Sequence, residues 1–175
     1  MKNVLTILFI VIANLVYGQK STDIVIRDKV NADLLEKLML DEINVYRKSK
    51  GLQPLMLDSN LFKQSRKHSE WMDSNKKLQH TVGGNYFSEC IFNAGYSNGY
   101  SYAVNAKNLI RVWIQSPGHN AILLDSRANT GGVGIKIQSN SYNGIYATLQ
   151  LSHIMTKEEL DGIPQYTRDG KLIKK

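Results

Sequence analysis

Cysteine is almost absent from this sequence: Cys90 is the only one in 175 residues. A single cysteine excludes an intramolecular disulfide, so a folded domain must depend on the packing of its core. It also excludes a lipoprotein anchor, which needs a cysteine directly after the leader cleavage site, where this chain has none. Long apolar runs are scarce as well. The run at residues 4–16 is shorter than the roughly 20 apolar residues that span a bilayer.

This apolar run lies close to the N-terminus and has the features of a secretory signal peptide. It follows a basic residue, Lys2, and ends in Tyr17-Gly18-Gln19, with a small residue where cleavage is expected. An uncleaved membrane anchor is the alternative, which the shortness of the run disfavours. We expect a signal peptide at residues 1–18, a polar lead-in at 19–30, one domain at 31–153 and a charged C-terminal tail at 154–175. Export predicts a secreted or periplasmic protein with no stable membrane anchor after cleavage.

Basic residues exceed acidic ones, and the formal net charge is +7. The basic residues are dispersed, except for Lys171, Lys174 and Lys175 near the C-terminus, and they are not interleaved with aromatic residues. A nucleic-acid groove needs such interleaving, so we expect no nucleic-acid partner. The expected partner is an extracellular or envelope ligand, such as a glycan, a peptide or a lipid.

Apolar periodicity predicts several helices followed by a β-hairpin. Helical spacing of apolar residues recurs at residues 31–50, 58–72 and 101–115, and in a short helix that begins at Ser116. Residues 86–92 are rich in β-formers, and alternation at 133–137 and 145–151 predicts two antiparallel strands. Strands and helices alternate too rarely for a parallel sheet. The fold class is therefore expected to be α+β, with layers packed on one core.

Six segments, taken in order, resemble the CAP superfamily, which includes cysteine-rich secretory proteins and plant pathogenesis-related proteins and is also called the SCP domain. They are NVYR at 44–47 with GLQPL at 51–55, residues 58–61 leading to HSEWM at 68–72, LQH at 78–80, ECI at 89–91, WIQSPGHNAIL at 113–123, and GVGI at 132–135 with the closing strand 145–151. The match is most similar to the disulfide-free bacterial branch. It implies a single α-β-α sandwich with a C-terminal antiparallel hairpin, in agreement with the elements predicted above.

The resemblance also implies a site. Family members often hold two histidines and two acidic residues in a central cleft, where they can bind zinc or another divalent cation. By motif position the histidines are His80 and His119, and the first acid is Glu89. Imidazole and carboxylate groups are good zinc ligands, and a metal-bound water can become a nucleophile near neutral pH. The second acid is missing, because Gln115 and Ser116 stand where it is expected.

Each of these residues also has a simpler interpretation. His119 could bond the backbone at its helix start, and His80 could be a plain surface residue. Glu89 needs a partner if it is buried, so the three side chains could form a structural polar cluster. His68 is expected in the core and His153 at the surface. Alternation along the strand is expected to bury Cys90 on the face opposite Glu89.

Three functions are compatible with this sequence. The first is a non-enzymatic binding module whose His/Glu cleft holds a ligand and a possible divalent metal. The second is a metal-dependent hydrolase that uses His80, Glu89 and His119, and the third is a lipid or sterol carrier. Neither Gln115 nor Ser116 is a general base, so the missing acid favours the binding module. Tyrosines at positions 86, 96, 100 and 102 are predicted to form an aromatic loop around the cleft.

Overall fold

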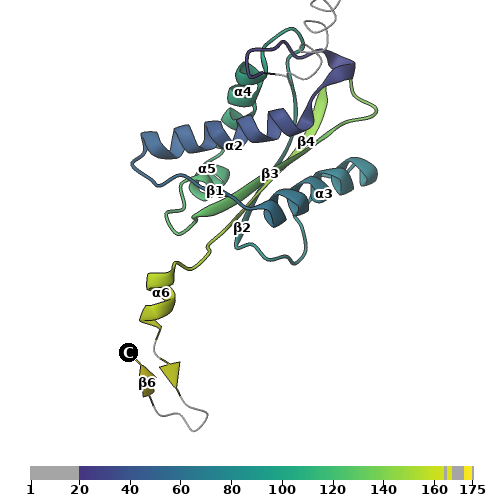
Figure 1. Cartoon of the computed structure of the whole chain (residues 1–175). Helices are drawn as coiled ribbons and strands as arrows, with labels where there is room; N and C mark the ends of the chain where they lie inside the picture. The colour runs from purple at the N-terminus through teal and green to yellow at the C-terminus, as the bar shows by residue number, and fades with distance from the viewer. Residues whose placement is uncertain (1–19, 164, 167–171, 175) are drawn as a thin grey trace, which may run out of the picture.

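The computed structural model describes residues 20–163, 165–166 and 172–174, so the predicted signal peptide lies outside the described residues. The described chain is a layered α+β domain, as predicted (Figure 1). Its elements are η1 (Arg27–Lys29), α2 (Ala32–Ser49), β1 (Met56–Leu57), α3 (Ser59–Asn75), β2 (Ser88–Gly95), α4 (Tyr102–Ile114), α5 (Pro117–Leu123), β3 (Thr130–Ile137), β4 (Gly144–Ser152), α6 (Lys157–Gly162), β5 (Gln165–Tyr166) and β6 (Leu172–Lys174). No helix in the described ranges is long and apolar enough to cross a membrane.

Local side-chain caps explain where the main helices begin. The Asn31 side chain accepts a hydrogen bond from the Leu34 amide at the start of α2, and asparagine is a preferred residue at this N-cap position. Asp58 caps α3 in the same way. Ser116 occupies the N-cap position of α5, directly before Pro117, but within the described structure its side chain makes no capping hydrogen bond.

The main sheet has the strand order β1-β3-β4-β2. The predicted hairpin of β3 and β4 is present, and β2 pairs antiparallel with the other edge of β4. Helix α3 packs on one face of the sheet, while α2, α4 and α5 lie on the other (Figure 1). Both faces of β4 are therefore covered. The C-terminal segment, with α6, extends away from these layers (Figure 1).

Two glycines of β3 let α3 lie directly on the sheet. A Cβ at Gly132 would sit 2.2 Å from the Phe62 amide nitrogen, and one at Gly134 would sit 2.0 Å from that of Arg66. The hydroxyls of Ser65 and Ser69 donate to the carbonyls of these glycines, each at 2.9 Å. This contact fixes the position of α3 against β3 and β4.

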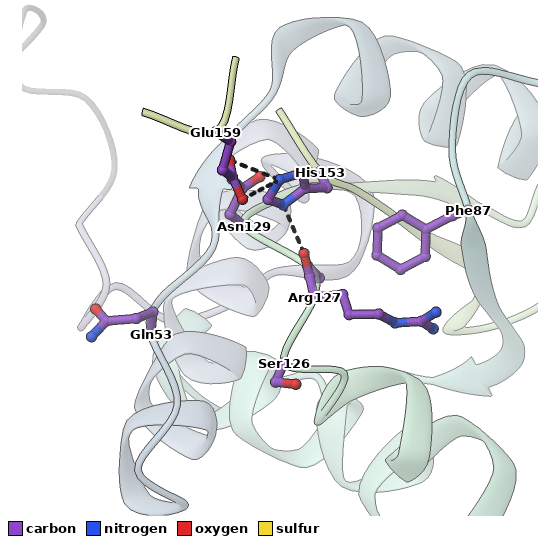
Figure 2. Close-up of a pocket in the computed structure, with 8 residues that line it drawn as sticks. Gln53, Phe87, Ser126, Arg127, Asn129, His153 and Glu159 are labelled. Carbon is purple, nitrogen blue, oxygen red and sulfur yellow. Dashed lines mark hydrogen bonds and ion pairs between the residues drawn. The ribbon is translucent and has the colours of Figure 1, made fainter. Parts of the chain in front are cut away.

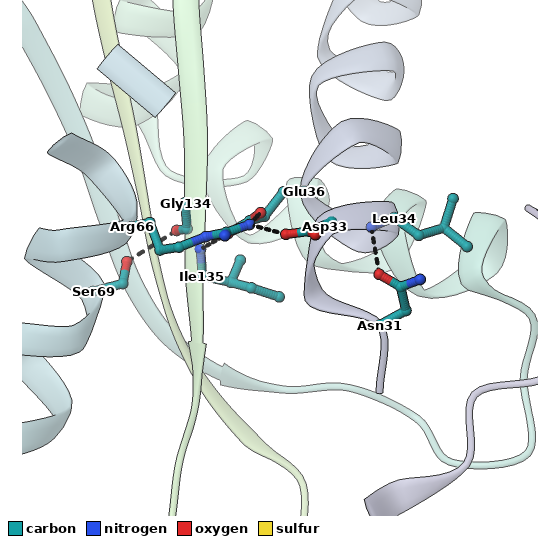
Figure 3. Close-up of polar contacts among 8 residues, drawn as sticks. All are labelled: Asn31, Asp33, Leu34, Glu36, Arg66, Ser69, Gly134 and Ile135. Atoms are coloured by element: carbon teal, nitrogen blue, oxygen red, sulfur yellow. Dashed lines mark hydrogen bonds and ion pairs between the residues drawn. The ribbon is translucent and has the colours of Figure 1, made fainter. Parts of the chain in front are cut away.

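A charged cluster joins α2 to α3 across the free edge of β3 (Figure 3). Arg66 of α3 pairs with Glu36 and Asp33 of α2, and the Glu36 carboxylate also accepts the Ile135 amide of β3 at 2.8 Å. β1 pairs with β3 only at Thr130 and Gly131, so no strand pairs with the Ile135 amide on this edge of β3. The Glu36 carboxylate accepts its hydrogen bond instead. Burial raises the pKa of Glu36, and the bonds from Arg66 and Ile135 oppose that rise.

Candidate functional site

Glu89 is the centre of a hydrogen-bonded polar cluster at the start of β2. Its side chain is only 3% exposed. One carboxylate oxygen accepts the Thr81 amide and lies 2.9 Å from Nδ1 of His80. The other accepts the Thr81 hydroxyl at 2.7 Å and the Gln150 side-chain amide at 2.9 Å. A buried carboxylate needs hydrogen-bond partners. The four donors around Glu89 meet this need, which the sequence predicts for a buried Glu89.

These contacts keep Glu89 ionised. Burial is the largest influence and raises its pKa, but the hydrogen bonds from Gln150, Thr81 and His80 together outweigh burial and hold the pKa below its ordinary value. An ionised carboxylate only accepts hydrogen bonds, so Nδ1 of His80 must carry the hydrogen. Nε2 of His80 is then the free ring nitrogen, on a side chain that is 60% exposed.

His119 reaches the same region from α5. Burial is the main cause that lowers the pKa of His119, and an electrostatic contribution from His80 lowers it further. The two imidazoles are therefore close enough to interact electrostatically, and His119 is neutral at neutral pH. Its Nδ1 is buried with no hydrogen-bond partner among the described residues.

Cys90 is fully buried on the opposite face of β2, as predicted. Its Sγ lies 3.7 Å from the His119 carbonyl oxygen. Burial is the main cause that raises the pKa of the thiol, and the charge of Glu89 adds to it. A thiol in this setting stays protonated and is a poor nucleophile.

The structure brings only some of the five predicted site residues together. His80 and Glu89 are in direct contact, and His119 is within electrostatic range of His80. Gln115 is exposed at the C-cap of α4, and Ser116 is half-buried at the N-cap of α5. The described part of the chain holds no group of three or more His, Cys, Asp or Glu side chains arranged to bind a metal. Both oxygens of Glu89 are already hydrogen-bonded within the protein, to His80, Thr81 and Gln150.

The structure has a hollow beside the Glu89 cluster that the sequence did not predict. Trp71 of α3 stacks on His68, with ring centroids 5.8 Å apart and an interplanar angle of 10°. His68 is buried, as predicted, and its Nε2 lies 2.7 Å from the Gln79 carbonyl oxygen. Two adjoining hollows of about 260 and 280 Å³ share His68, Trp71 and Thr81. We call them together the Trp71 groove, lined by Gln64, Lys67, His68, Trp71, Gln79, His80, Thr81, Val82 and Gln150.

The predicted aromatic loop around the cleft is wrong for two of its four tyrosines, whereas the Tyr86 hydroxyl does lie beside the cluster and donates to the Thr81 carbonyl. Tyr96 and Tyr102 are 2% and 0% exposed and belong to the core. The Tyr96 hydroxyl donates to the Arg27 carbonyl, and the Tyr102 hydroxyl accepts the Asn31 amide. Tyr96 and Tyr102 come after the end of β2 that lies away from Glu89. Burying a large aromatic ring stabilises the fold, so both rings pack in the core instead of forming a surface loop.

A separate cavity of about 650 Å³ lies where the C-terminal segment meets the domain (Figure 2). His153, predicted at the surface, lies across this joint. Its Nδ1 is 2.9 Å from the Arg127 carbonyl oxygen, and its Nε2 is 3.1 Å from the Glu159 carboxylate (Figure 2). Phe87 forms part of the wall. The charged groups at this cavity are thus engaged in contacts within the protein, and the cavity holds none of the predicted site residues.

The layered fold and the His80–Glu89 pair define a single domain of the class that the sequence resembles. The family model for CAP, the cysteine-rich secretory protein family, matches residues 40–151, and the chain belongs to this family. A comparison with curated protein sequences finds no match.

Solved structures share the fold at low sequence identity. An outer surface protein from Borrelia burgdorferi is similar with a TM-score of 0.56 and 17% identity over 72% of this chain and 98% of that one. An extracellular protein containing an SCP domain from Bacillus anthracis has a TM-score of 0.51 and 19% identity over 69% of this chain and 41% of that one. The crystal structure of NaASP2 with Zn²⁺ has a TM-score of 0.54 and 13% identity over 77% of this chain and 83% of that one.

The bonding of Glu89 predicts a pH-dependent loss in the variant Glu89→Gln. We expect a loss of about 1–3 kcal/mol in the free energy of unfolding at neutral pH, since a charged acceptor with four partners is removed. A lowered pKa stabilises the fold above the ordinary value of 4.5, and this stabilisation is lost as the pH falls through the lowered pKa. The difference between the two proteins should therefore shrink in acid.

Urea unfolding at neutral and acidic pH measures this difference. Glu70→Gln is the matched control, because Glu70 is exposed on α3, and it should change stability little at either pH. An equal loss for Glu89→Gln at both pH values would contradict an ionised, hydrogen-bonded Glu89.

Proposed function

We propose that this protein is a non-enzymatic binding module that acts outside the cytoplasm. The observation that carries the proposal is the complete engagement of Glu89 by His80, Thr81 and Gln150. A carboxylate with four hydrogen-bond partners is suited to orient His80. It is poorly suited to act as a general base, which must reach a substrate proton directly. The neutral Gln115 and Ser116, where the family's second acid is expected, supply no replacement.

Two arguments support a location of this protein outside the cytoplasm. The N-terminal residues are those of a signal peptide, which routes a chain out of the cytoplasm. The similar protein from Bacillus anthracis is described as extracellular, and the one from Borrelia burgdorferi as an outer surface protein. Export from a bacterial cytoplasm into the periplasm or the medium is consistent with both.

The site also suits a divalent metal held by His80 and His119. The hydrogen bond from Nδ1 to Glu89 sets the orientation of the His80 ring and leaves Nε2 free, an arrangement common among metal-bound histidines that donate to a carboxylate. The lowered pKa of His119 keeps its ring neutral, the form that binds metal. A bound zinc would supply a Lewis-acidic centre for ligand binding. NaASP2, a similar fold, was crystallised with Zn²⁺.

Zinc calorimetry tests the metal part of the proposal. We expect saturable zinc binding by the purified protein and its loss in the double variant His80→Ala/His119→Ala. His153→Ala is the control, since His153 lines a separate cavity. Equal zinc binding by the protein and the double variant would show that these two histidines do not hold the metal.

A hydrolysis assay tests the non-enzymatic part. The zinc-loaded protein and the double variant are incubated with labelled casein and with p-nitrophenyl acetate. The proposal expects no difference between the two proteins. Turnover that disappears in the double variant would establish a metal-dependent hydrolase instead.

A further inference from the structure

We propose that the Trp71 groove binds one sugar ring of a glycan. This inference rests on the proposed function and names the ligand class of that binding module. The carrying observation is an exposed, preset aromatic ring beside a buried polar acceptor that has no partner among the described residues. The two features lie in the same groove, next to the His80–Glu89 pair.

The first feature is a platform made by Trp71. Trp71 is 40% exposed, and its ring lies nearly parallel to that of His68 beneath it. His68 is itself buried and held by the Gln79 carbonyl, so the platform is rigid before a ligand arrives. The C–H bonds on one face of a sugar ring carry partial positive charge, which the negative face of an indole attracts. A preset ring also lowers the entropy lost on binding.

The second feature is the side-chain amide of Gln150. Gln150 is 1% exposed, it lines the groove, and its Nε2 is already committed to Glu89. Its Oε1 has no hydrogen-bond partner among the described residues. A buried acceptor without a donor is unfavourable, and a sugar hydroxyl can supply that donor. Gln64 and Lys67, which precede Trp71 on α3, place further polar groups along the same hollow.

The walls of the groove favour a sugar over a peptide. Extended peptides are commonly recognised by pairing with the exposed edge of a sheet. The groove is lined instead by α3, residues 79–82 and β4, and both edges of β4 are already paired, with β3 and with β2. The two hollows have volumes of about 260 and 280 Å³, and their size and mixed polar and aromatic lining match one sugar ring.

The two tryptophans allow a direct test. Trp113 is fully buried in the core, so its indole N–H signal in NMR should not respond, whereas that of Trp71 should. The purified protein is titrated with chitotetraose, cellotetraose and maltotetraose. We expect a saturable shift of the Trp71 indole signal with at least one of these sugars. Trp71→Ala should weaken that binding about tenfold, the scale of one lost stacked ring, and Trp71→Phe should retain most of it.

Phe87→Ala is the control for aromatic surface. Phe87 is 42% exposed, close to the value of Trp71, but it lines the separate cavity (Figure 2), so its loss should leave sugar binding unchanged. No saturable shift with any of the three sugars overturns the inference, as does equal affinity in Trp71→Ala. A Trp71-dependent response to random heptapeptides without any response to sugars also overturns it.

Failure of this inference and failure of the proposed function give different results. Absence of sugar binding with zinc binding intact removes only the sugar. New reducing ends that accumulate during the titration would support the sugar as ligand while contradicting a non-enzymatic module.

Discussion

Replacing Gly134 by alanine is expected to cost more than about 3 kcal/mol in the free energy of unfolding, the upper range for overpacked cores. The added Cβ would lie 2.0 Å from the Arg66 nitrogen and 2.3 Å from the Ser65 carbonyl carbon. Both are backbone atoms, so no side-chain rotation relieves the clash. Helix α3 would have to move off β3, and the carbonyl of residue 134 would lose the Ser69 hydroxyl.

Urea unfolding of Gly134→Ala beside Gly118→Ala measures this effect. Gly118 lies in α5, and a Cβ there would meet no atom within 4 Å. We expect Gly118→Ala to be neutral or slightly stabilising, because alanine favours a helix more than glycine does. A loss below about 1 kcal/mol for Gly134→Ala, within the usual range for a tolerated core change, would contradict the direct contact of α3 with the sheet.

Replacing Arg47 by methionine is expected to cost about 3–5 kcal/mol, since several buried acceptors lose a charged donor at once. Arg47 is 1% exposed, and its guanidinium donates to four backbone carbonyls. They belong to Gln53, Leu123, Asp125 and Ala128, at 2.8 to 3.0 Å. Methionine fills much of the same volume, so the loss reports mainly the unpaired carbonyls.

The same variant tests how His119 is positioned. Three of the four carbonyls lie at the end of α5 or shortly after it, and α5 is the helix that carries His119. We therefore expect Arg47→Met to weaken zinc binding as well as stability. Lys48→Ala, at an exposed neighbouring position, is the control and should change neither. Stability within about 1 kcal/mol of the native protein would show that these carbonyls do not depend on Arg47.

Much of the fold could be predicted because its signals are local. Asn31 and Asp58 cap helices through their own side chains, and the order of the motifs identified the family. The burial of Cys90 opposite Glu89 followed from alternation along one strand. These features depend on a few neighbouring residues, so the sequence pattern alone is sufficient to predict them.

The groove and its polar floor depend on contacts between distant segments. The alternation in β4 marks its apolar face but not the contacts of the polar residues between, and α3 covers that second face, so Thr148 and Gln150 are buried as well. The hydrogen bond from Gln150 to Glu89 joins residues 61 positions apart. Trp71 follows His68 by three residues on α3, and that spacing was the available signal for the stacked pair. Tyr96 and Tyr102 were misplaced because the glycines and asparagines around them indicated a surface loop.

The tautomer of His80 is the most direct test of the account, because it reports whether Glu89 orients this ring for binding. Long-range ¹H–¹⁵N NMR of the metal-free protein, at a pH above the ordinary pKa of histidine, distinguishes the two tautomers. The account predicts the hydrogen on Nδ1 and a free lone pair on Nε2, with this preference lost in Glu89→Leu. A hydrogen on Nε2 in the native protein would contradict it. Nδ1 would then have no hydrogen to donate to Glu89, and Nε2 would have no free lone pair.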